Sequence, residues 1–386
     1  MIGERSQRIG PASRLVGGFL VVVTAVAGVV LLPDATPSSA AQVDARCADT
    51  GTDAATIQSA INASSPGDEI VIDGPCLITS TLRLLNDRTY RGDSRAGTIL
   101  TQADGANLAA MMATQSWVDN VTYTSSGIRI EKLTLDGNRA ANTGTVPLML
   151  RAWNSRVYDV EIAGAPGDGI RATSVSQNGT RLVNTTQVNS IIADVFIRDS
   201  GGHGIHVVDP DNAVTDWIVE RAWIADSDGS GIDLDNSAGW QIRNLHLYGS
   251  DQHAINARRC FNTGIHDNYV ENFGTEGTGG TTYFGIRCTV QGGVGNTIVG
   301  NKVNQMFGLP AAGSFVSIGL DGVNYGAGRV TVAANTVIGQ GSTREIGLNY
   351  SKANGPSLSV VSTGNLVDLV GTARRLGTGV TVTAGQ

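Results

Sequence analysis

Two aspartates separated by one residue are the pair in this sequence best suited to acid–base chemistry. Asp233 and Asp235 lie in Gly-Ser-Gly-Ile-Asp-Leu-Asp-Asn, a segment that alternates as a β-strand does. Residues i and i+2 of a strand face the same side, with backbones roughly 6.5–7 Å apart. That separation is compatible with an acid and a base on either side of a glycosidic bond. Two carboxylates this close repel each other, which favours one of them holding a proton.

The segment that holds these aspartates is one copy of a recurring phrase, a short polar turn followed by Gly-Ile and an alternating strand. Its aligned isoleucines recur every 23 to 35 residues, at positions 170, 205, 232, 255 and 286. A period of this length is typical of a solenoid, in which each repeat stacks on the next. Isoleucine and the residue two positions later then point inward, and the residues between and after them point outward.

Stacking the copies brings polar side chains of different repeats into columns on one outward face. The position after each isoleucine reads Arg171, His206, Asp233, Asn256 and Arg287. The position three after it reads Thr173, Val208, Asp235, Arg258 and Thr289. The position two before it reads Asp168, His203, Ser230, His253 and Phe284.

We interpret this face as an active site. The predicted catalytic residues are Asp233, Asp235, His206 and Arg258, and the predicted substrate-binding residues are His203, His253, Asn256, Arg287 and Arg171. His206 and Asn256 would orient the aspartates, and Arg258 would stabilise developing charge or bind a uronate carboxylate. The alternative is a face without chemistry, because exposed solenoid turns and strands also favour Asp and Asn.

Composition and repeat length predict an all-β parallel β-helix over residues 41–371, followed by a tail or last strand over 372–386. Fifty glycines and 5% aromatic residues suit tight turns and small stacked side chains. A β-propeller is disfavoured, since no run of hairpin turns is visible. Residues 53–62 predict a short helix that caps the first open coil. Asparagines at 268, 301, 335 and 365 predict a ladder in which each bonds the same residue of the next coil.

Residues 1–40 predict an export signal. Arg5, Arg8 and Arg14 precede the uncharged, mostly apolar run Leu15–Leu32, and Ser38-Ser39-Ala40 offers a cleavage site. An uncleaved membrane anchor is the alternative, given the length of the run. We therefore expect a secreted, extracellular protein with no stable membrane association after cleavage. A net charge of -7 argues against a nucleic-acid partner.

The four cysteines fit an oxidising compartment. Cys260 and Cys288 lie about one repeat apart, and Cys47 and Cys76 bracket the first mature segment. We predict two disulfides, Cys47–Cys76 and Cys260–Cys288. A zinc site is not expected, since no pair of cysteines has metal-ligand spacing.

The segment Gly51-Thr52-Asp53 to Ile70-Val71-Ile72, with Ile57-Gln58-Ser59-Ala60-Ile61 inside it, resembles the start of the pectate lyase-like superfamily of single-stranded right-handed β-helices. Leu133-Thr134-Leu135-Asp136-Gly137-Asn138 is similar to a phrase common there. The resemblance implies a secreted or surface protein that acts on polysaccharide as a lyase, hydrolase, epimerase or phage-type depolymerase. Fold alone does not choose among these activities.

Motifs that would identify a single enzyme family or a calcium loop are incomplete in this sequence. Gly202-His203-Gly204 is similar to a motif of polygalacturonase-type hydrolases, but the Asn-Thr-Asp, Asp-Asp and Arg-Ile-Lys partners are missing in that order, so it assigns no role to His203. Asp209-Pro210-Asp211-Asn212 is similar to a motif of alginate epimerases but lacks its His and Glu, and we expect a turn there. Asp226–Gly231 resembles the start of a calcium loop, yet Ser237 stands where a bidentate acid is needed. No cofactor is expected, with calcium as the alternative.

Three functions remain open on these residues. The leading hypothesis is a glycoside hydrolase that uses Asp233 and Asp235 as acid and base. The second is a β-eliminating lyase or epimerase on a uronate polymer, with Arg258 or His206 abstracting the C5 proton. The third is a non-catalytic carbohydrate-binding β-helix with an aromatic platform, for which Trp217, Trp223 and Trp240 are the candidates. Each has a polysaccharide as its partner, and a homotrimer is compatible with all three.

Overall fold

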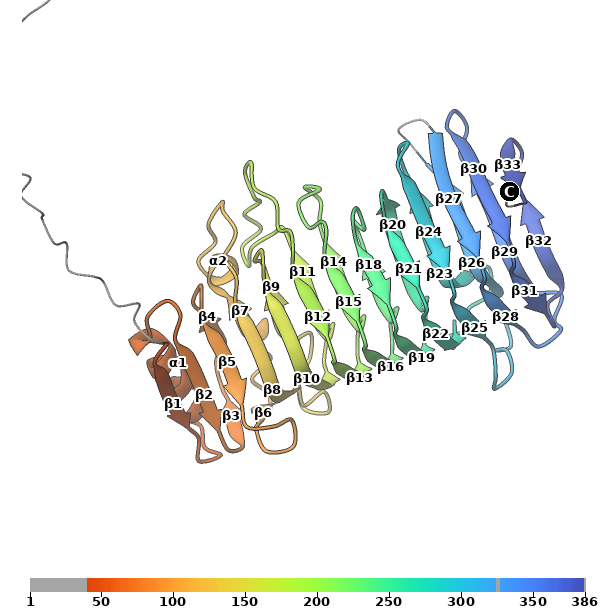
Figure 1. The fold of residues 1–386 in the computed structure, drawn as a ribbon. Helices are drawn as coiled ribbons and strands as arrows, with labels where there is room; N and C mark the ends of the chain where they lie inside the picture. Colours follow the sequence, from red (N-terminus) through yellow and green to blue (C-terminus); the bar gives the residue numbers. More distant parts are fainter. Residues whose placement is uncertain (1–39, 324–326, 385–386) are drawn as a thin grey trace, which may run out of the picture. The chain divides into compact units, whose positions relative to one another are not determined.

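Parallel strands wind through the chain in successive coils, and each complete coil contributes to two sheets (Figure 1). The structure is a computed structural model that describes residues 40–323 and 327–384. Every ladder between its named strands is parallel, as the repeat period requires. The predicted parallel β-helix is therefore confirmed.

Sheet B carries the recurring Gly-Ile phrase. Its strands are β4 (Leu82–Leu84), β7 (Ala110–Thr114), β9 (Val146–Leu150), β11 (Ile170–Thr173), β14 (Ile205–Val208), β17 (Ile232–Leu234), β20 (Ile255–Cys260), β23 (Thr282–Val290), β26 (Ser314–Gly322), β29 (Glu345–Lys352) and β32 (Thr372–Leu376).

Sheet A has two arms that share the long strands β8 (Arg129–Asp136) and β10 (Arg156–Ala165). The first arm adds β1 (Gln42–Arg46), β2 (Glu69–Asp73), β5 (Thr89–Gly92), β12 (Ile191–Ala193), β15 (Ile218–Glu220), β18 (Gln241–Arg243), β21 (Gly264–His266), β24 (Gly295–Val299), β27 (Ala327–Ala333), β30 (Ser357–Thr363) and β33 (Val380–Thr383). The second arm adds β3 (Cys76–Ile78), β6 (Ile99–Gln102), β13 (Phe196–Ser200), β16 (Trp223–Ser227), β19 (His246–Ser250), β22 (Tyr269–Phe273), β25 (Lys302–Asn304), β28 (Thr336–Ile338) and β31 (Leu366–Asp368).

The aligned isoleucines stack without a slip. Ile170 pairs with Ile205, and the register continues through 232, 255 and 286. All five side chains are buried, as are the residues two positions later: Ala172, Val207, Leu234, Ala257 and Cys288. Gly204 precedes one of these isoleucines because an added Cβ would lie 2.6 Å from the carbonyl oxygen of Gly231 in the next coil. The phrase is thus a packing requirement between coils.

The corner between the two arms of sheet A is built from one left-handed residue per coil. Asp194, Arg221, Asn244 and Asp267 have φ between 50° and 55°, and Gly300 takes the same place with φ 73°. The following residue points inward, and from residue 268 onward it is asparagine.

The predicted asparagine ladder is confirmed in this inward column. Asn268 donates through its backbone N–H and its Nδ2 to Oδ1 of Asn301, which repeats both bonds to Asn335. Asn335 repeats them to Asn365. Each side chain thus holds two coils at once and satisfies polar groups inside the solenoid.

Helix α1 (Asp53–Ala63) covers the first coil and buries Ile57 and Ile61, which confirms the predicted capping helix. A second helix, α2 (Gln115–Val118), follows β7 and was not predicted. Both predicted disulfides are present, with Cα–Cα separations of 5.2 Å for Cys47–Cys76 and 6.0 Å for Cys260–Cys288. Residues 372–383 contribute β32 and β33, which pair with β29 and β30.

The predicted export signal lies almost entirely in residues 1–39, outside the described residues. Within the described ranges, no helix combines the length and apolar composition that a bilayer-spanning segment needs.

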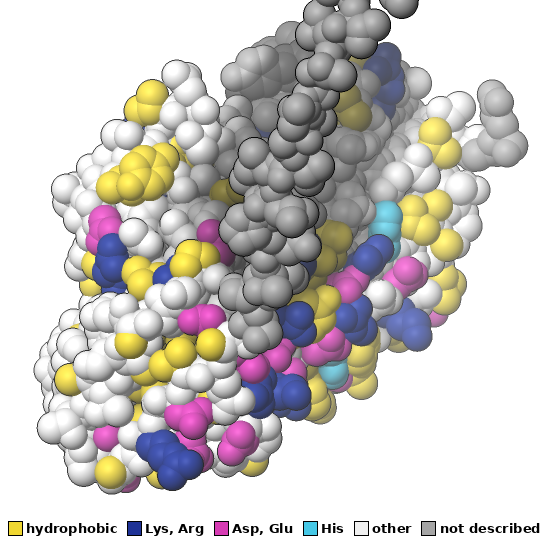
Figure 2. All heavy atoms as spheres, turned by 60° about the vertical axis from the view of Figure 1, so that its left-hand side comes forward, with side chains coloured by type: hydrophobic (Ala, Val, Ile, Leu, Met, Phe, Trp, Pro, Cys, Tyr) yellow, Lys and Arg dark blue, Asp and Glu magenta, His cyan; other side chains and the backbone are white. Residues whose placement is uncertain are grey.

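Oppositely charged side chains of neighbouring coils pair across sheet A. Arg198 donates to Glu161 at 2.9 Å, Arg243 donates to Glu220 at 2.7 Å, and His246 lies 2.9 Å from Glu271. Figure 2 shows acidic and basic side chains interleaved along one side of the molecule, with histidines among them. Pairing of this kind places a charge of opposite sign beside each of these side chains.

We expect Asn301→Ala to lower the free energy of unfolding by about 1–3 kcal/mol, because the buried N–H of Asn268 would lose its acceptor. Urea denaturation followed by circular dichroism measures the change. Asn62→Ala, on the exposed side of α1, is the matched control and should change stability by less than about 0.5 kcal/mol. Equal midpoints for the two variants would contradict the structural role of the ladder.

Candidate active site

The polar residues of sheet B occupy a central stretch of its outward face between two apolar clusters. On one side Ala110, Ala113, Trp117, Val146 and Met149 pack together where α2 covers β7 and β9. On the other side Phe284, Val316 and Ile346 form a second cluster. Between them the register places Arg171, His206, Asp233, Asn256 and Arg287 in one column, as predicted. The same column continues to Arg83 at one end of the sheet and to Asn349 and Arg375 at the other, beyond the apolar clusters.

The column two positions before the isoleucines is a ladder of side-chain acceptors. Asp168 Oδ1 accepts the backbone N–H of His203 at 2.9 Å, and His203 Nδ1 accepts that of Ser230 at 2.8 Å. Ser230 Oγ and His253 Nδ1 accept the next N–H groups, those of His253 at 3.4 Å and Phe284 at 3.2 Å. Each side chain therefore binds the backbone of the following coil. The ladder stops at Phe284, which has no acceptor to offer.

These bonds fix the chemical state of two histidines. An Nδ1 that accepts an N–H carries no proton, so His203 and His253 are neutral and keep their proton on Nε2. Burial lowers the pKa of His253 to about 4, with the positive charge of Arg287 acting in the same direction. Burial and the neighbouring His206 likewise lower the pKa of His203. For the predicted role in substrate binding, each ring has only Nε2–H to offer.

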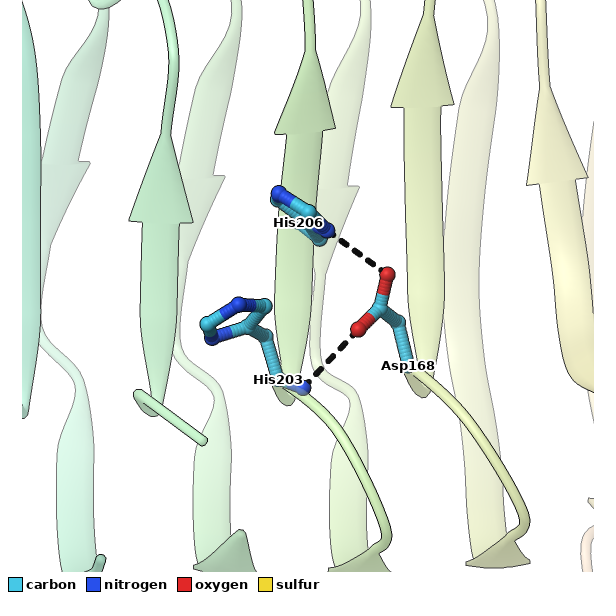
Figure 3. A group of neighbouring side chains, drawn as sticks. All are labelled: Asp168, His203 and His206. Carbon is cyan, nitrogen blue, oxygen red and sulfur yellow. Dashed lines mark hydrogen bonds and ion pairs between the residues drawn. The ribbon is translucent and has the colours of Figure 1, made fainter. Parts of the chain in front are cut away.

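Asp168 is the residue that joins the two columns (Figure 3). Its Oδ2 lies 2.7 Å from His206 Nδ1 and accepts Arg171 Nε at 2.7 Å and Nη2 at 2.6 Å. Burial opposes ionisation, but the bond from His206, the charge of Arg171 and the His203 N–H together hold the Asp168 pKa well below its usual value. Asp168 therefore stays a carboxylate, orients the imidazole and leaves His206 Nε2 as the free ring nitrogen.

Asp233 and Asp235 form a second cluster with Arg258. Arg258 Nη2 lies 2.6 Å from Asp233 Oδ1 and 2.8 Å from Asp235 Oδ1. Asn256 Nδ2 donates to Asp233 Oδ2 at 3.2 Å, so Asn256 orients this aspartate as predicted. The shared guanidinium offsets the repulsion between the two carboxylates.

A β-bulge aims Arg258 at the aspartates. Ala257 pairs with Cys288 but Cys260 pairs with Val290, so β20 holds one extra residue between these points. Arg259 takes a left-handed φ of 55° there. Arg258 Nε and Asn256 Oδ1 are buried and have no hydrogen-bond partner among the described residues. A bulge beside a polar cluster re-aims a side chain without changing the coils on either side.

Several sequence-based expectations need correction. His206 bonds Asp168 rather than the Asp233–Asp235 pair, because Nδ1 faces the preceding coil. The predicted column three positions after the isoleucines, with Arg258 and Thr289 in register, is broken by the bulge. Trp217 and Trp240 are fully buried and stack in the core, so neither can form an exposed platform.

The remaining site residues divide between the two ends of the column. Arg171 binds Asp168, and Arg287 pairs with Asp321 at 2.9 Å while its guanidinium lies over the Phe284 ring. Sequence reasoning assigned no role to Asp168. The available signal was Gly167-Asp168-Gly169-Ile170, the same phrase with a carboxylate where other copies carry His or Ser.

Asp168, His203 and His206 place three possible metal-ligand atoms within 4.8 Å of one another. Their own contacts argue for a different arrangement. Arg171 already supplies a cation at Asp168 Oδ2, and a metal there would have to displace it. In the segment that resembles a calcium loop, Asp228 pairs with Arg139. In the separate segment 209–212, Asp209 accepts the N–H groups of Ala213 and Val214 and shapes the predicted turn.

Comparison with known proteins places this site on a familiar scaffold. A stretch covering 90% of the chain superposes on the whole A-module of the Azotobacter vinelandii mannuronan C-5 epimerase AlgE6, with a TM-score of 0.53 and 15% identity. A stretch covering 86% of the chain superposes on 62% of the tailspike protein of E. coli bacteriophage HK620, with a TM-score of 0.60 and 11% identity. The chain has the pectin lyase fold. Its coils accordingly wind as a right-handed parallel β-helix.

In sequence, 220 residues are 27% identical to the exo-poly-alpha-D-galacturonosidase of Dickeya chrysanthemi. The alignment covers 49% of this chain and 36% of that relative, so the chain matches about a third of the relative's length. No protein-family profile matches the sequence.

We expect the protein to lose stability as the pH falls from about 6.5 to 4. In this window an unfolded histidine binds a proton that folded His253 does not, so the free energy of unfolding decreases. The loss from His253 is on the order of 3 kcal/mol. Asp168 does not contribute here, because the stability it adds is lost only below its ordinary value of 3.8.

His253→Asn is the matched variant, since Asn Oδ1 can accept the Phe284 N–H in place of Nδ1 and does not titrate. Urea unfolding at several pH values should give a shallower pH dependence for this variant. Curves of identical slope for the variant and the natural protein would rule out His253 as the source.

Proposed function

We propose that the protein is an enzyme that acts on a uronate-containing polysaccharide at the outward face of sheet B. Three arginines, Arg171, Arg258 and Arg287, lie along this face, and guanidinium groups bind carboxylates well. The names of similar proteins support the substrate class: one acts on a galacturonate polymer, and the epimerase on mannuronan.

The observation that carries the reaction is the bond between His206 Nδ1 and the buried carboxylate of Asp168. A carboxylate behind an imidazole fixes its tautomer and stabilises the imidazolium that forms when Nε2 takes a proton. The His206 side chain is 18% exposed, which gives Nε2 access to a ligand. His206 is therefore the base that this site supports best.

The reaction we propose is abstraction of the C5 proton of a uronate residue. His206 Nε2 takes the proton, and an arginine at the sugar carboxylate stabilises the charge that develops next to it. In β-elimination the C5–H electron pair forms the C4–C5 double bond, the C4–O bond breaks, and the leaving oxygen takes a proton. In epimerisation a proton returns to C5 from the opposite face.

Hydrolysis is the second candidate, and the galacturonosidase relative favours it. It would use Asp233 and Asp235, whose oxygens both lie within 3 Å of Arg258 Nη2. Because both oxygens contact one nitrogen, the carboxylates are closer than the roughly 6.5–9.5 Å that leaves room for a water. One would therefore have to give a proton to the leaving oxygen while the other attacks the sugar as a nucleophile, and water would then release the sugar.

Replacing His206 by Gln should lower the rate on uronate polymers by at least about 10²-fold, the lower scale for losing general acid–base help. A polysaccharide panel, read by absorbance at about 235 nm, reducing ends and exchange of the C5 proton with solvent deuterium, measures each reaction. His266→Gln is the matched control, because His266 lies on sheet A and bonds Thr297 there.

The same panel separates the candidates. Elimination yields absorbance with reducing ends, epimerisation yields exchange alone, and hydrolysis yields reducing ends alone. Loss of at least about 10²-fold in Asp233→Asn and Asp235→Asn, with full activity in His206→Gln, would replace our proposal by hydrolysis. A chain that binds polymer but leaves every readout unchanged is a carbohydrate-binding protein.

We also propose that the protein works outside the cell. Two disulfides are in keeping with an oxidising compartment. Cleavage of an export signal and assembly into a homotrimer stay predictions.

A further inference from the structure

A stack of aromatic side chains follows the second arm of sheet A, on a different face from the candidate active site. Phe196, Trp223, His246 and Tyr269 begin four successive strands and pair in register. Their ring centroids are 5.4, 5.0 and 4.7 Å apart from one coil to the next. Trp223 is one of the candidates that the sequence offers for an aromatic platform, whereas the other three residues of this stack have no role assigned from the sequence.

Trp223 is the member that packing leaves open. Its ring is nearly parallel to His246, with an interplanar angle of 15°, so one face of the indole is covered. Phe196 lies on the other side at a centroid distance of 5.4 Å and a tilt of 48°, so it covers that face only in part. Trp223 remains 49% exposed, whereas Trp217 and Trp240 are fully buried. Leaving half of a tryptophan side chain in water forgoes the hydrophobic free energy that its burial would supply. A smaller residue at this position would forgo less.

A hollow of about 760 Å³ lies beside these rings. Its aromatic wall is Phe196, Trp223 and His246, and its polar wall includes the corner residues Asp194, Arg221 and Asn244. The corner repeats once per coil, so the hollow presents similar groups at each step along the solenoid. A periodic surface of this kind suits a periodic ligand.

The charges around the hollow are mostly paired already. Arg221 binds Asp194 at 2.8 Å as well as Glu220, and Arg95 binds Asp159 at 3.1 Å. Asp267, which also lines it, adds a carboxylate. The hollow thus offers hydrogen-bond donors and acceptors, and its lining holds two arginines against three aspartates, which favours a neutral ligand over a polyanion.

We propose that this hollow binds a neutral glycan chain, with Trp223 as the residue on which a sugar ring stacks. The face of an aromatic ring is electronegative and complements the C–H groups on the face of a sugar. The polar corner residues would bind the hydroxyl groups around the sugar's rim. The site lies on another sheet and takes a ligand of different charge, so it stands independently of the function proposed for sheet B.

The test is retention of the purified protein on insoluble neutral glycans, namely a β-glucan, a xylan and a mannan, with a polygalacturonate gel in parallel. Trp223→Ala should weaken binding to the retained neutral glycan by about tenfold or more. Trp153→Ala is the matched control, because Trp153 is the other tryptophan with substantial exposure, 43%, and follows β9 on a turn. Its binding should equal that of the natural protein.

Trp223→Leu keeps apolar bulk without the indole and replaces Trp223→Ala if thermal unfolding shows that the alanine variant is destabilised. Fluorescence adds a direct readout: soluble oligosaccharides of the bound glycan should shift the emission of Trp153→Phe but not of Trp223→Phe. The inference is overturned if no neutral glycan retains the protein, or if the leucine variant binds as the natural protein does. Neither result depends on whether sheet B is catalytic.

Discussion

Each coil of this protein is placed by the parallel hydrogen bonds that it makes to the coil before it. Along sheet B these bonds keep one register from Ile170 to Ile286, so residues 23 to 35 positions apart in sequence become lateral neighbours. Every column in the molecule depends on that register. It stacks the apolar core, passes the asparagine bonds from coil to coil, and lines up the outward residues that carry chemistry.

The electrostatics of the outward face rest on pairs that the register brings together. Asp168 binds Arg171 of its own coil and His206 of the following coil. Arg258 contacts two aspartates of the coil that precedes its own. Desolvated charges are costly, and these are held in place by several bonds each, which offset part of the cost. The result is a site whose imidazole is oriented before any ligand arrives, while His203 and His253 are kept neutral by the backbone.

The repeated phrase was enough to predict the fold, the Cys260–Cys288 disulfide and the column from Arg171 to Arg287, because each follows from period and alternation. The capping helix followed from the helical spacing of its apolar residues. The phrase could not predict which partners the outward side chains choose. His206 turns toward Asp168 through its rotamer, and the aim of Arg258 depends on a bulge that no spacing reveals. Trp217 and Trp240 lie outside the phrase, so their burial had no sequence signal. Asp168 was visible in the alignment of copies, but its role required the contacts.

The bulge in β20 separates the direction of a side chain from the register of the coil that carries it. Its extra residue lies between Ala257 and Cys260, and Cys260 is bonded to Cys288 of the next coil. The chain can thus deviate locally and is returned to register by a covalent link. The carbonyl of Arg258 still accepts the N–H of Ser237 in the preceding coil, so the backbone of the deviation stays anchored while its side chains lie outside the regular columns. A change of specificity during evolution, or by design, has its least constrained starting point there.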